Sequence, residues 1–370
     1  MSQKRSLLVY GAGAIGRGYI PWVYDGQDFD YHYVEANPEL RGALQTQRHF
    51  TTFKTTAQGY EAQGVTVAGC YAPGEEGHLL DRVDGIITCV GPRNFDGLEP
   101  MLGAARVPVV CCENDADLPR SMRERTGNPH IVFAIPDVIT SSTASDELLA
   151  RDPLAVITED GTCFAERGAA ALGGHCSYID SDALAVQWAA KLYIHNTPHC
   201  IAAYLGNLLG ARYLHDTMRH PAAARIVEGA MHEMRAMLEA SLHIDPGFLA
   251  FYAAKERARF KNTLLCDPIS RVAREPFRKL ALNERLIGAA QRCLAAGILP
   301  RHLMLGIMAA FRFASDSDPD YHIKFLLRSL SPAEFLRTII RLRDNEALFE
   351  LLIAHWGDNM RTLEGFQHDQ

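Results

Sequence analysis

The ten residues KLYIHNTPHC, Lys191 to Cys200, place a charged group, an amide and two imidazoles inside an otherwise apolar run. Such groups are costly on a buried helix face unless they have partners or take part in chemistry. Lysine can exchange a proton, an asparagine amide can donate to an oxygen, and histidine can do either. The segment is therefore a candidate site, and a snorkelling lysine beside satisfied core histidines is the structural alternative.

Thr197 followed by Pro198 predicts a helix start, with threonine as N-cap and proline at the first helical position. We expect one helix to end near His195 and a second to run from Pro198 to about Leu209. On an unbroken helix Asn196 would lie about 140° from Lys191 and His199 about 80° from it. A break at Thr197 could therefore let the three side chains converge.

A zinc pair at His195 and His199 is the rival interpretation of this segment, because the two residues are four apart. No carboxylate accompanies them in the H-E-x-x-H arrangement of zinc hydrolases. We therefore expect no metal here.

A second motif lies near the amino terminus, where the apolar run SLLVY is followed by GAGAIGRG. Gly11, Gly13 and Gly16, with Ala14 and Ile15 between the last two, fit the dinucleotide-binding fingerprint in its context of strand, turn and helix. The next predicted strand ends at Glu35, about twenty residues after the last glycine, where a carboxylate can bind the adenosine ribose and repel a 2′-phosphate. The motif predicts NAD rather than NADP. The alternative is a glycine-rich turn beside an incidental acid.

Further apolar segments alternate with helical or polar ones, as in a parallel sheet with crossover connections. Ligands gather at the carboxyl ends of such strands, and the residues at those ends include Gly91, Asn114 and Asp137. Residues 49–70 are predicted to form a hairpin or strand insertion outside the parallel wind, and residues 154–167 a late strand region. The apolar segments are GIITCVG (Gly85 to Gly91), VPVVCCEN (Val107 to Asn114) and HIVFAIPDVIT (His130 to Thr140).

The pattern becomes helical from about Ser181, with apolar residues at helical spacing and charges between them. We therefore predict an α/β protein with an N-terminal Rossmann-type doubly wound sheet, residues 1–180. An all-helical C-terminal domain, residues 181–370, carries the substrate site.

The composition is that of a globular protein: 370 residues, 48% hydrophobic and 22% charged, with a net charge of −7. The negative charge argues against nucleic acid as a partner, although a local anion pocket remains compatible with it. No apolar run is long enough to cross a membrane. The nine cysteines form no C-x-x-C pair, which together with the absence of a signal-like segment predicts reduced thiols in a cytoplasmic protein.

The combination of motifs resembles the polyol-specific long-chain dehydrogenases, the mannitol dehydrogenase family. Lys-x4-Asn-x2-His, carried by Lys191, Asn196 and His199, is similar to the family signature, and GAGAIGRG to its cofactor loop. CEN, ending at Asn114, is similar to the segment with its oxyanion-side asparagine. RFKNTLLCDPISRVAREPFRKL and NERLIG resemble the mannitol-1-phosphate branch. The resemblance implies metal-independent, NAD-linked oxidation of a secondary alcohol.

In such a reaction Lys191 would be the general base, because without a metal a lysine of lowered pKa can take the hydroxyl proton. Asn196 and Asn114 would hold the oxygen as charge develops, and His199 would orient the substrate hydroxyl. Two departures from the family pattern bear on the substrate and on the helix bend: Val138 stands where the family has arginine after Asp137, and Pro198 replaces a small residue.

A dense group of basic residues in the second half predicts a site for a substrate phosphate, with a solvated helix face as the alternative. Arg271, Arg278 and Arg285 recur every seven residues, so some could share a face. We expect reversible oxidation of mannitol 1-phosphate to fructose 6-phosphate by a monomer or weak homo-oligomer. The alternative substrate is a non-phosphorylated polyol, a uronate or another anionic secondary alcohol, and the alternative class is a non-catalytic NAD-binding sensor. The candidate substrate-binding residues are Asp137, Arg259, Lys261, Asn262, Arg274, Arg278 and Lys279.

Overall fold

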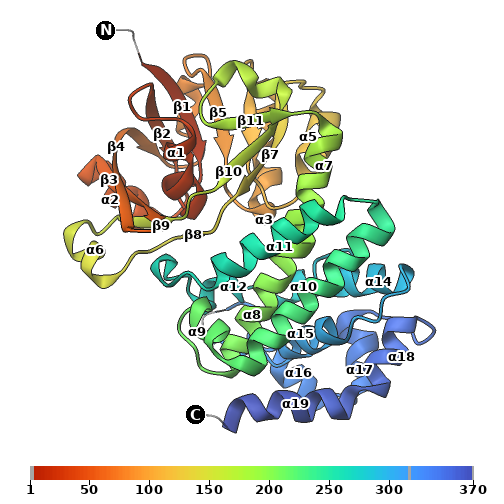
Figure 1. Cartoon of the computed structure of the whole chain (residues 1–370). Helices are drawn as coiled ribbons and strands as arrows, with labels where there is room; N and C mark the ends of the chain where they lie inside the picture. The colour runs from red at the N-terminus through yellow and green to blue at the C-terminus, as the bar shows by residue number, and fades with distance from the viewer. Residues whose placement is uncertain (1–3, 316–317, 369–370) are drawn as a thin grey trace. The chain divides into compact units, whose positions relative to one another are not determined.

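The structure is a computed structural model that describes residues 4–315 and 318–368 (Figure 1). The chain divides into two compact units. Unit 1 comprises Met1–Trp188 with Leu264–Cys266, and unit 2 comprises Ala189–Thr263 with Asp267–Gln370. The transition at Trp188 falls inside helix α7 (Ser181–Ala190), which begins where the sequence predicts the change from strands to helices.

Unit 1 is built on a sheet with apolar side chains on both faces. In strand β1 (Arg5–Tyr10) Leu7 and Val9 join one core cluster, whereas Leu8 and Tyr10 join another. Successive side chains of a strand point to opposite faces, so the continuous run LLVY fills both clusters at once. This burial on both faces is typical of a doubly wound parallel sheet.

The central strands follow the order β7-β6-β5-β1-β2-β4 and pair in parallel. This is the order of a dinucleotide-binding sheet, in which the wind reverses beside β1 and ligands bind at that reversal. The predicted strands are therefore confirmed as a Rossmann-type wind. The strands concerned are β2 (Phe29–Val34), β4 (Gly59–Tyr71), β5 (Gly85–Thr88), β6 (Val109–Cys111) and β7 (Ile131–Asp137).

The predicted hairpin at residues 49–70 is present as the antiparallel pair β3 (His49–Thr56) and β4. The expectation that it stands outside the parallel wind is wrong for its second strand. The last residues of the long β4 also pair in parallel with β2, so one strand serves both arrangements. The remaining strands extend the sheet at its two ends: β8 (Thr140–Ser141), β9 (Val156–Thr158), β10 (Thr162–Glu166) and β11 (Cys176–Ile179).

Helices and short turns connect these strands. The π-helix η1 (Ala14–Tyr19) continues directly into α1 after β1. The other helices of unit 1 are α2 (Pro38–Gln47), α3 (Pro92–Phe95), α4 (Glu99–Ala104), α5 (Asp117–Thr126) and α6 (Asp146–Arg151), with α1 covering Ile20–Val23. Its 3₁₀ turns are η2 (Glu76–Leu79), η3 (Asp96–Leu98) and η4 (Arg167–Leu172), and η6 (Thr263–Leu265) ends beside Cys266.

Unit 2 is built around α8 (Thr197–Leu208), which is buried along nearly its whole length. It packs against α10 (Pro221–Leu242), α12 (Ile269–Val272) and α15 (Arg301–Phe311), and Figure 1 shows these helices gathered around it. Small residues allow the close approach: a Cβ on Gly306 of α15 would meet Ile201 of α8 at 2.4 Å. The predicted helical C-terminal part is confirmed.

The other helical segments of unit 2 complete this bundle, and the described helices include none long and apolar enough to span a bilayer. These segments are η5 (Lys191–Asn196), α9 (Leu214–Arg219), α11 (Pro246–Phe260), α13 (Pro276–Lys279), α14 (Ile287–Ala295), α16 (Ile323–Ser329), α17 (Pro332–Phe335), η7 (Leu336–Ile340), α18 (Ala347–Ala354) and α19 (Trp356–His368).

Candidate active site

The glycine-rich loop after β1 has the backbone that a dinucleotide fingerprint requires. Gly11 has φ +91, in the left-handed region, and a Cβ there would meet the carbonyl oxygen of Cys89 at 2.5 Å. A Cβ on Gly16 would meet the carbonyl oxygen of Gly11 at 2.0 Å, so the helix start lies directly on the turn. A Cβ on Gly13 would meet nothing within 4 Å. The first and third glycines are thus needed for packing, and the second faces open space that a phosphate could approach.

The carboxylate of Glu35 is tied to this loop. One of its oxygens accepts from the backbone N–H of Ala12 at 2.8 Å, and the other accepts from the N–H of Asn37 at 2.8 Å. Arg41 donates to the carbonyl oxygen of Glu35 at 2.9 Å from the following helix. The predicted ribose-binding residue therefore sits at the end of β2 in contact with the glycine loop.

The turn after β5 lies on the other side of β1 from β2, where the strand order of the sheet reverses. Gly91 has φ +82 and begins α3. The buried carboxylate of Glu113 accepts from the N–H groups of Val90 and Gly91, at 3.0 and 2.8 Å, and burial raises its pKa despite these bonds. Sequence reasoning placed Glu113 at a strand end but missed that it holds the turn at Gly91.

These residues together fit a nicotinamide dinucleotide. Gly11, Gly13 and Gly16 leave room at the start of η1, where Ala14 and Ile15 form the first π-helical turn. The carboxylate of Glu35 contacts this loop at the end of β2, where a dinucleotide-binding sheet places the acid for the ribose. Unit 1 therefore fits a nicotinamide cofactor, and the roles of its individual predicted binding residues stay predictions.

Asn114 and Asp137 also lie in unit 1, each at the carboxyl end of a strand. Asn114 follows Glu113 after β6, and Asp137 is buried at the end of β7, where its backbone pairs with Thr162. Val138 is 7% exposed and would contact a Cβ on Gly161. The roles predicted for Asn114 and Asp137 remain predictions.

The segment Lys191–Asn196 is a π-helix, η5, that leads without interruption into α8. The predicted break and N-cap at Thr197 are therefore wrong. Thr197 is helical, with φ −66 and ψ −58, and both its N–H and its hydroxyl contact the carbonyl oxygen of Leu192. Its hydroxyl also lies 2.8 Å from the carbonyl oxygen of Arg285. Threonine thus satisfies the wide π-turn instead of starting a new helix.

The π-turn explains how the signature residues can share one side of a helix. In a π-helix the hydrogen bond runs between residues five apart, so one turn connects Lys191 to Asn196. His199 follows three residues later, which is one step along the face of the α-helix. The wider turn changes the angle between Lys191 and Asn196 around the helix axis. The sequence suggested that a break in the helix would be needed for this change. Lys191 and Asn196 are both buried, at 9% and 6% exposure.

The two histidines of the segment each contact a different buried carboxylate of unit 2. Nδ1 of His195 contacts Glu256 of α11, whose other oxygen accepts from Arg259 at 2.6 Å. Nε2 of His199 lies 3.0 Å from Asp267. The ring centroids of the two histidines are 4.9 Å apart, and Phe260 stacks on His199 at 5.2 Å. Among the residues that the structure describes, no group of three or more acidic, histidine or cysteine side chains is arranged to hold a metal ion.

The protonation state of His199 follows from its surroundings. Burial lowers the pKa of His199 to about 4, although the charge of Asp267 opposes this shift. Burial also opposes ionisation of Asp267, but Arg271 and His199 outweigh it and lower the pKa of that carboxyl. An ionised carboxylate only accepts, so Nε2 of the neutral imidazole donates to Asp267. Its Nδ1 then carries a lone pair that can accept from a hydroxyl group.

The basic residues predicted to bind phosphate occupy different settings. Arg259 is buried against Glu256, and Lys261 lies 3.2 Å from Glu228. Arg278 contacts Glu275 at 2.8 Å and Glu284 at 3.4 Å. Arg274 is exposed, and its Nε donates to the carbonyl oxygen of Arg271 at 3.2 Å. Asn262 follows Lys261 just before η6.

Lys279 is buried in unit 2 and not on a solvated face. Its ammonium group contacts the carbonyl oxygen of Val272 and lies 5.6 Å from the ring centroid of Tyr204. Burial lowers its pKa to about 7. Of the arginines spaced seven apart, Arg271 contacts Asp267, whereas Arg278 and Arg285 both contact Glu284.

Sequence reasoning missed the acidic partners, Glu256 and Asp267, and the aromatic Phe260. The signal was local: Glu256 precedes Arg259 by three residues and Asp267 precedes Arg271 by four, spacings at which helical ion pairs form. Such ion pairs are common on helix surfaces, so the spacing alone did not distinguish these two buried pairs from exposed ones.

Comparison with known proteins matches both halves of the chain. Residues 5–124 match the mannitol dehydrogenase Rossmann domain, and residues 187–322 match the mannitol dehydrogenase C-terminal domain. A mannitol-1-phosphate 5-dehydrogenase of Bacillus licheniformis is 27% identical over 94% of this chain and 98% of its own length.

Solved structures agree on the fold. Mannitol 2-dehydrogenase of Pseudomonas fluorescens, in a ternary complex with NAD and D-mannitol, superposes with a TM-score of 0.72 at 16% identity, covering 98% of this chain and 94% of its own. A substrate-free D-sorbitol dehydrogenase gives 0.62 at 12% identity, covering 98% and 92%. With a Rossmann unit that fits a nicotinamide cofactor and a helical unit carrying Lys191, Asn196 and His199, the chain belongs to the mannitol dehydrogenase family.

Proposed function

We propose that this protein is an NAD-dependent dehydrogenase that oxidises a secondary alcohol of a polyol phosphate, converting mannitol 1-phosphate to fructose 6-phosphate reversibly. The observation that carries the proposal is the π-turn from Lys191 to Asn196, followed by a His199 held neutral by its burial and hydrogen-bonded to Asp267. The mannitol-1-phosphate 5-dehydrogenase among the relatives supports the substrate class.

Oxidation of the alcohol separates a hydride from the carbinol carbon and a proton from its hydroxyl. Bound NAD supplies the hydride acceptor. Lys191 takes the proton as general base, and the amide of Asn196 donates to the oxygen as negative charge develops on it. No metal is needed in this scheme, because amine and amide together handle the proton and the charge.

His199 orients the substrate and leaves the proton to Lys191. At neutral pH its imidazole is uncharged, and its Nε2 donates a hydrogen bond to Asp267. The lone pair on Nδ1 can accept from a substrate hydroxyl, which fixes the substrate in one orientation. The second histidine, His195, is held by Glu256 and packs beside it, which suits a supporting position.

Recognition of the phosphate would fall chiefly to Arg274. Within the described part of the chain no carboxylate contacts this arginine, whereas Arg259, Lys261 and Arg278 already have acidic partners. Because these three basic residues are already paired, they are less available to a substrate phosphate. This favours a second candidate function, in which the same oxidation acts on a non-phosphorylated polyol. The two functions differ only in the substrate group that the basic residues must bind.

The experiment is a comparison of fructose 6-phosphate and fructose as substrates for reduction, followed by NADH absorbance. We expect kcat/KM to be at least about 100-fold higher for the phosphate ester, since charge-assisted hydrogen bonds contribute about 1.5–3 kcal/mol each. Arg274→Met should reduce this preference and leave the rate with fructose unchanged. Equal rates with the two sugars, or a preference for fructose, would favour the non-phosphorylated polyol.

A further inference from the structure

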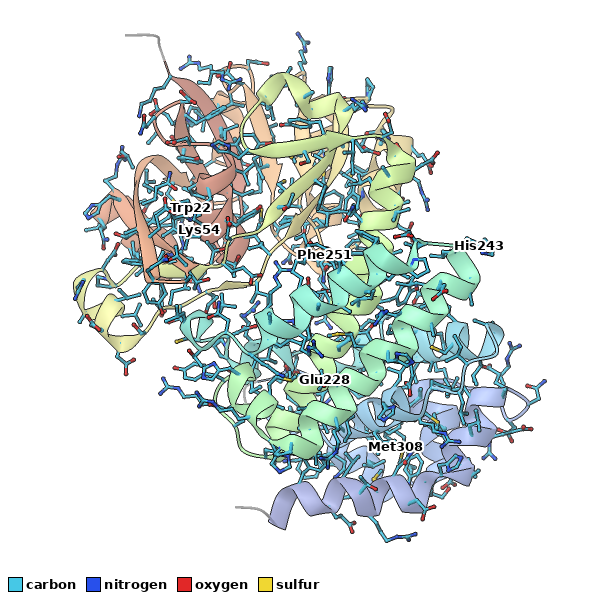
Figure 2. The ribbon with its side chains drawn as sticks, viewed as in Figure 1. Trp22, Lys54, Glu228, His243, Phe251 and Met308 are labelled. Atoms are coloured by element: carbon cyan, nitrogen blue, oxygen red, sulfur yellow. The ribbon has the colours of Figure 1, made fainter. Side chains whose placement is uncertain are left out.

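A groove runs between α10 and α11 on unit 2, outside the candidate active site. Its volume is about 240 Å³. Figure 2 labels Glu228, which stands on α10 where the row of lining residues begins. The lining residues are Glu228, Met231, His232 and Arg235 from α10, and Ala250, Ala253, Ala254 and Arg257 from α11.

The spacing of these residues explains why there is space here. The α10 residues are three, four and seven positions from the first, so they form one continuous stripe on that helix. The facing positions on α11 are mostly alanines, which reach only a short distance from the backbone. Long polar side chains on one helix thus meet short apolar ones on the other.

The groove carries an excess of positive charge. Glu228 lies 3.2 Å from the ammonium group of Lys261, which compensates its charge. Across the described residues, neither Arg235 nor Arg257 lies within ion-pair distance of a carboxylate. Two arginines on opposite helices are thus left without counter-charges in a protein whose net charge is −7.

Arg235 also has an unsatisfied donor. Its Nε is buried and has no hydrogen-bond partner. A guanidinium group presents its N–H donors in a planar fork that matches the oxygens of a phosphate or carboxylate. A buried donor of this kind is costly without an acceptor. The Nε itself is out of reach of solvent, so an oxyanion in the groove would bind the other N–H donors of this guanidinium group.

We propose that the groove between α10 and α11 binds a small oxyanion, a phosphate group, between Arg235 and Arg257 with His232 beside it. The site is separate from the histidine pair: Arg257 is displaced by about 100° around α11 from Glu256, which contacts His195. The proposal does not depend on the reaction assigned above. The phosphate could be inorganic or belong to a phosphorylated metabolite, because both present the same oxygens.

The test is titration of the full-length protein with inorganic phosphate in a calorimeter, at constant ionic strength set with NaCl. Arg257→Met, at an exposed position, should weaken phosphate binding at least tenfold, and Arg235→Met should do the same. Arg225→Met, at an exposed position of α10 outside the groove, is the matched control and should leave the affinity unchanged. No measurable phosphate binding, or equal affinity in all four proteins, would overturn the proposal.

A steric variant tests the location without changing charge. Ala254→Leu fills the groove from an exposed position and should weaken phosphate binding at least tenfold. Arg274→Met should leave the affinity unchanged, whereas loss of phosphate binding in that variant alone would place the anion at the active site and overturn the proposal. Repeating the titrations with fructose 6-phosphate in the Arg274→Met background separates the sources. If fructose 6-phosphate binds more tightly than inorganic phosphate, the groove takes a phosphorylated metabolite, and if the two affinities are equal, it takes free phosphate. In both cases Arg257→Met must weaken the binding, which shows that the ligand occupies the groove.

Discussion

The two candidate functional segments of this chain both contain a π-helical turn, but the turn has a different role in each. In η1, after the glycine loop, the groups that can meet a ligand are backbone groups, and the side chains that matter are the absent ones of Gly11, Gly13 and Gly16. In η5 the turn positions side chains, and their partners come from distant parts of unit 2. One site is made by local chain geometry and the other by tertiary contacts.

This difference affects how each site can fail. The glycine loop is sensitive to an added methyl group, because its atoms already touch at Gly11 and Gly16. The η5 segment depends on Asp267 and Glu256, which orient its histidines, and on Thr197, which satisfies the π-turn. Substitutions in the two segments should therefore separate cofactor binding from turnover.

The largest expected effect is loss of turnover in Lys191→Met. We expect kcat to fall by about 10³, since a positioned general base contributes about 10²–10⁴. NADH affinity, measured by fluorescence titration, should stay within about twofold of the parent because the glycine loop is untouched. Activity close to that of the parent would refute the role of Lys191.

Two matched variants sharpen this result. Lys324→Met removes a lysine from α16 and should leave both quantities unchanged. Gly16→Ala should show the opposite defect, loss of NADH binding, because its Cβ would meet the carbonyl oxygen of Gly11 at 2.0 Å. If Lys191→Met weakened NADH binding as much as Gly16→Ala did, the two segments would not be separable.

A smaller effect is expected for cofactor choice in Glu35→Ser. Removing the carboxylate takes away a ribose partner and the repulsion of a 2′-phosphate, while Arg41 remains beside the site. We expect the ratio of kcat/KM for NADH over NADPH to fall about 10–100-fold, given about 1.5–3 kcal/mol for a charged hydrogen bond.

The control for cofactor choice is Glu39→Ser, which removes an exposed carboxylate from the first turn of α2. It should leave the ratio of the two cofactors near that of the parent. An unchanged ratio in Glu35→Ser would remove Glu35 from the ribose site.

An effect of similar size concerns stability in acid. Because burial lowers the pKa of His199 from 6.5 to about 4, the unfolded chain binds a proton there at a higher pH than the folded chain does. The stability associated with His199 is therefore present above pH 6.5 and is lost as the pH falls toward 4. This loss should be on the order of 2–3 kcal/mol.

Urea unfolding at pH 7 and pH 4.5 measures this loss. His199→Gln should lose less free energy of unfolding than the parent between these pH values, because glutamine does not titrate. His355→Gln, at an exposed position of unit 2, should lose as much as the parent. If His199→Gln and the parent lost the same amount, the imidazole would not be held neutral by burial.

Much of unit 1 could be predicted from the sequence because its signals are local. The run LLVY fills two core clusters by alternation, and the spacing of Gly11, Gly13 and Gly16 indicated the turn. The dual pairing of β4 was missed because a single strand gave no sign that its two ends have different neighbours.

The η5 segment could be located but not built from its sequence. Thr197-Pro198 is a strong N-cap pattern, yet the structure has Thr197 inside a continuous helix. The hydroxyl of Thr197 also has a partner far away in the chain, the carbonyl oxygen of Arg285, which the local pattern does not indicate. The fold therefore overrides the local preference at Thr197.

The sequence by itself determined the parallel wind, the glycine loop with Glu35, and the grouping of Lys191, Asn196 and His199 within nine residues. It did so because each depends on neighbours in the chain. Only the tertiary structure decided which charges are compensated. Arg259 meets Glu256, Asp267 meets His199 and Arg271, and Arg235 and Arg257 are left to face a groove. Charge pairing depends on distance in space, and the spacing of residues along a chain does not fix that distance.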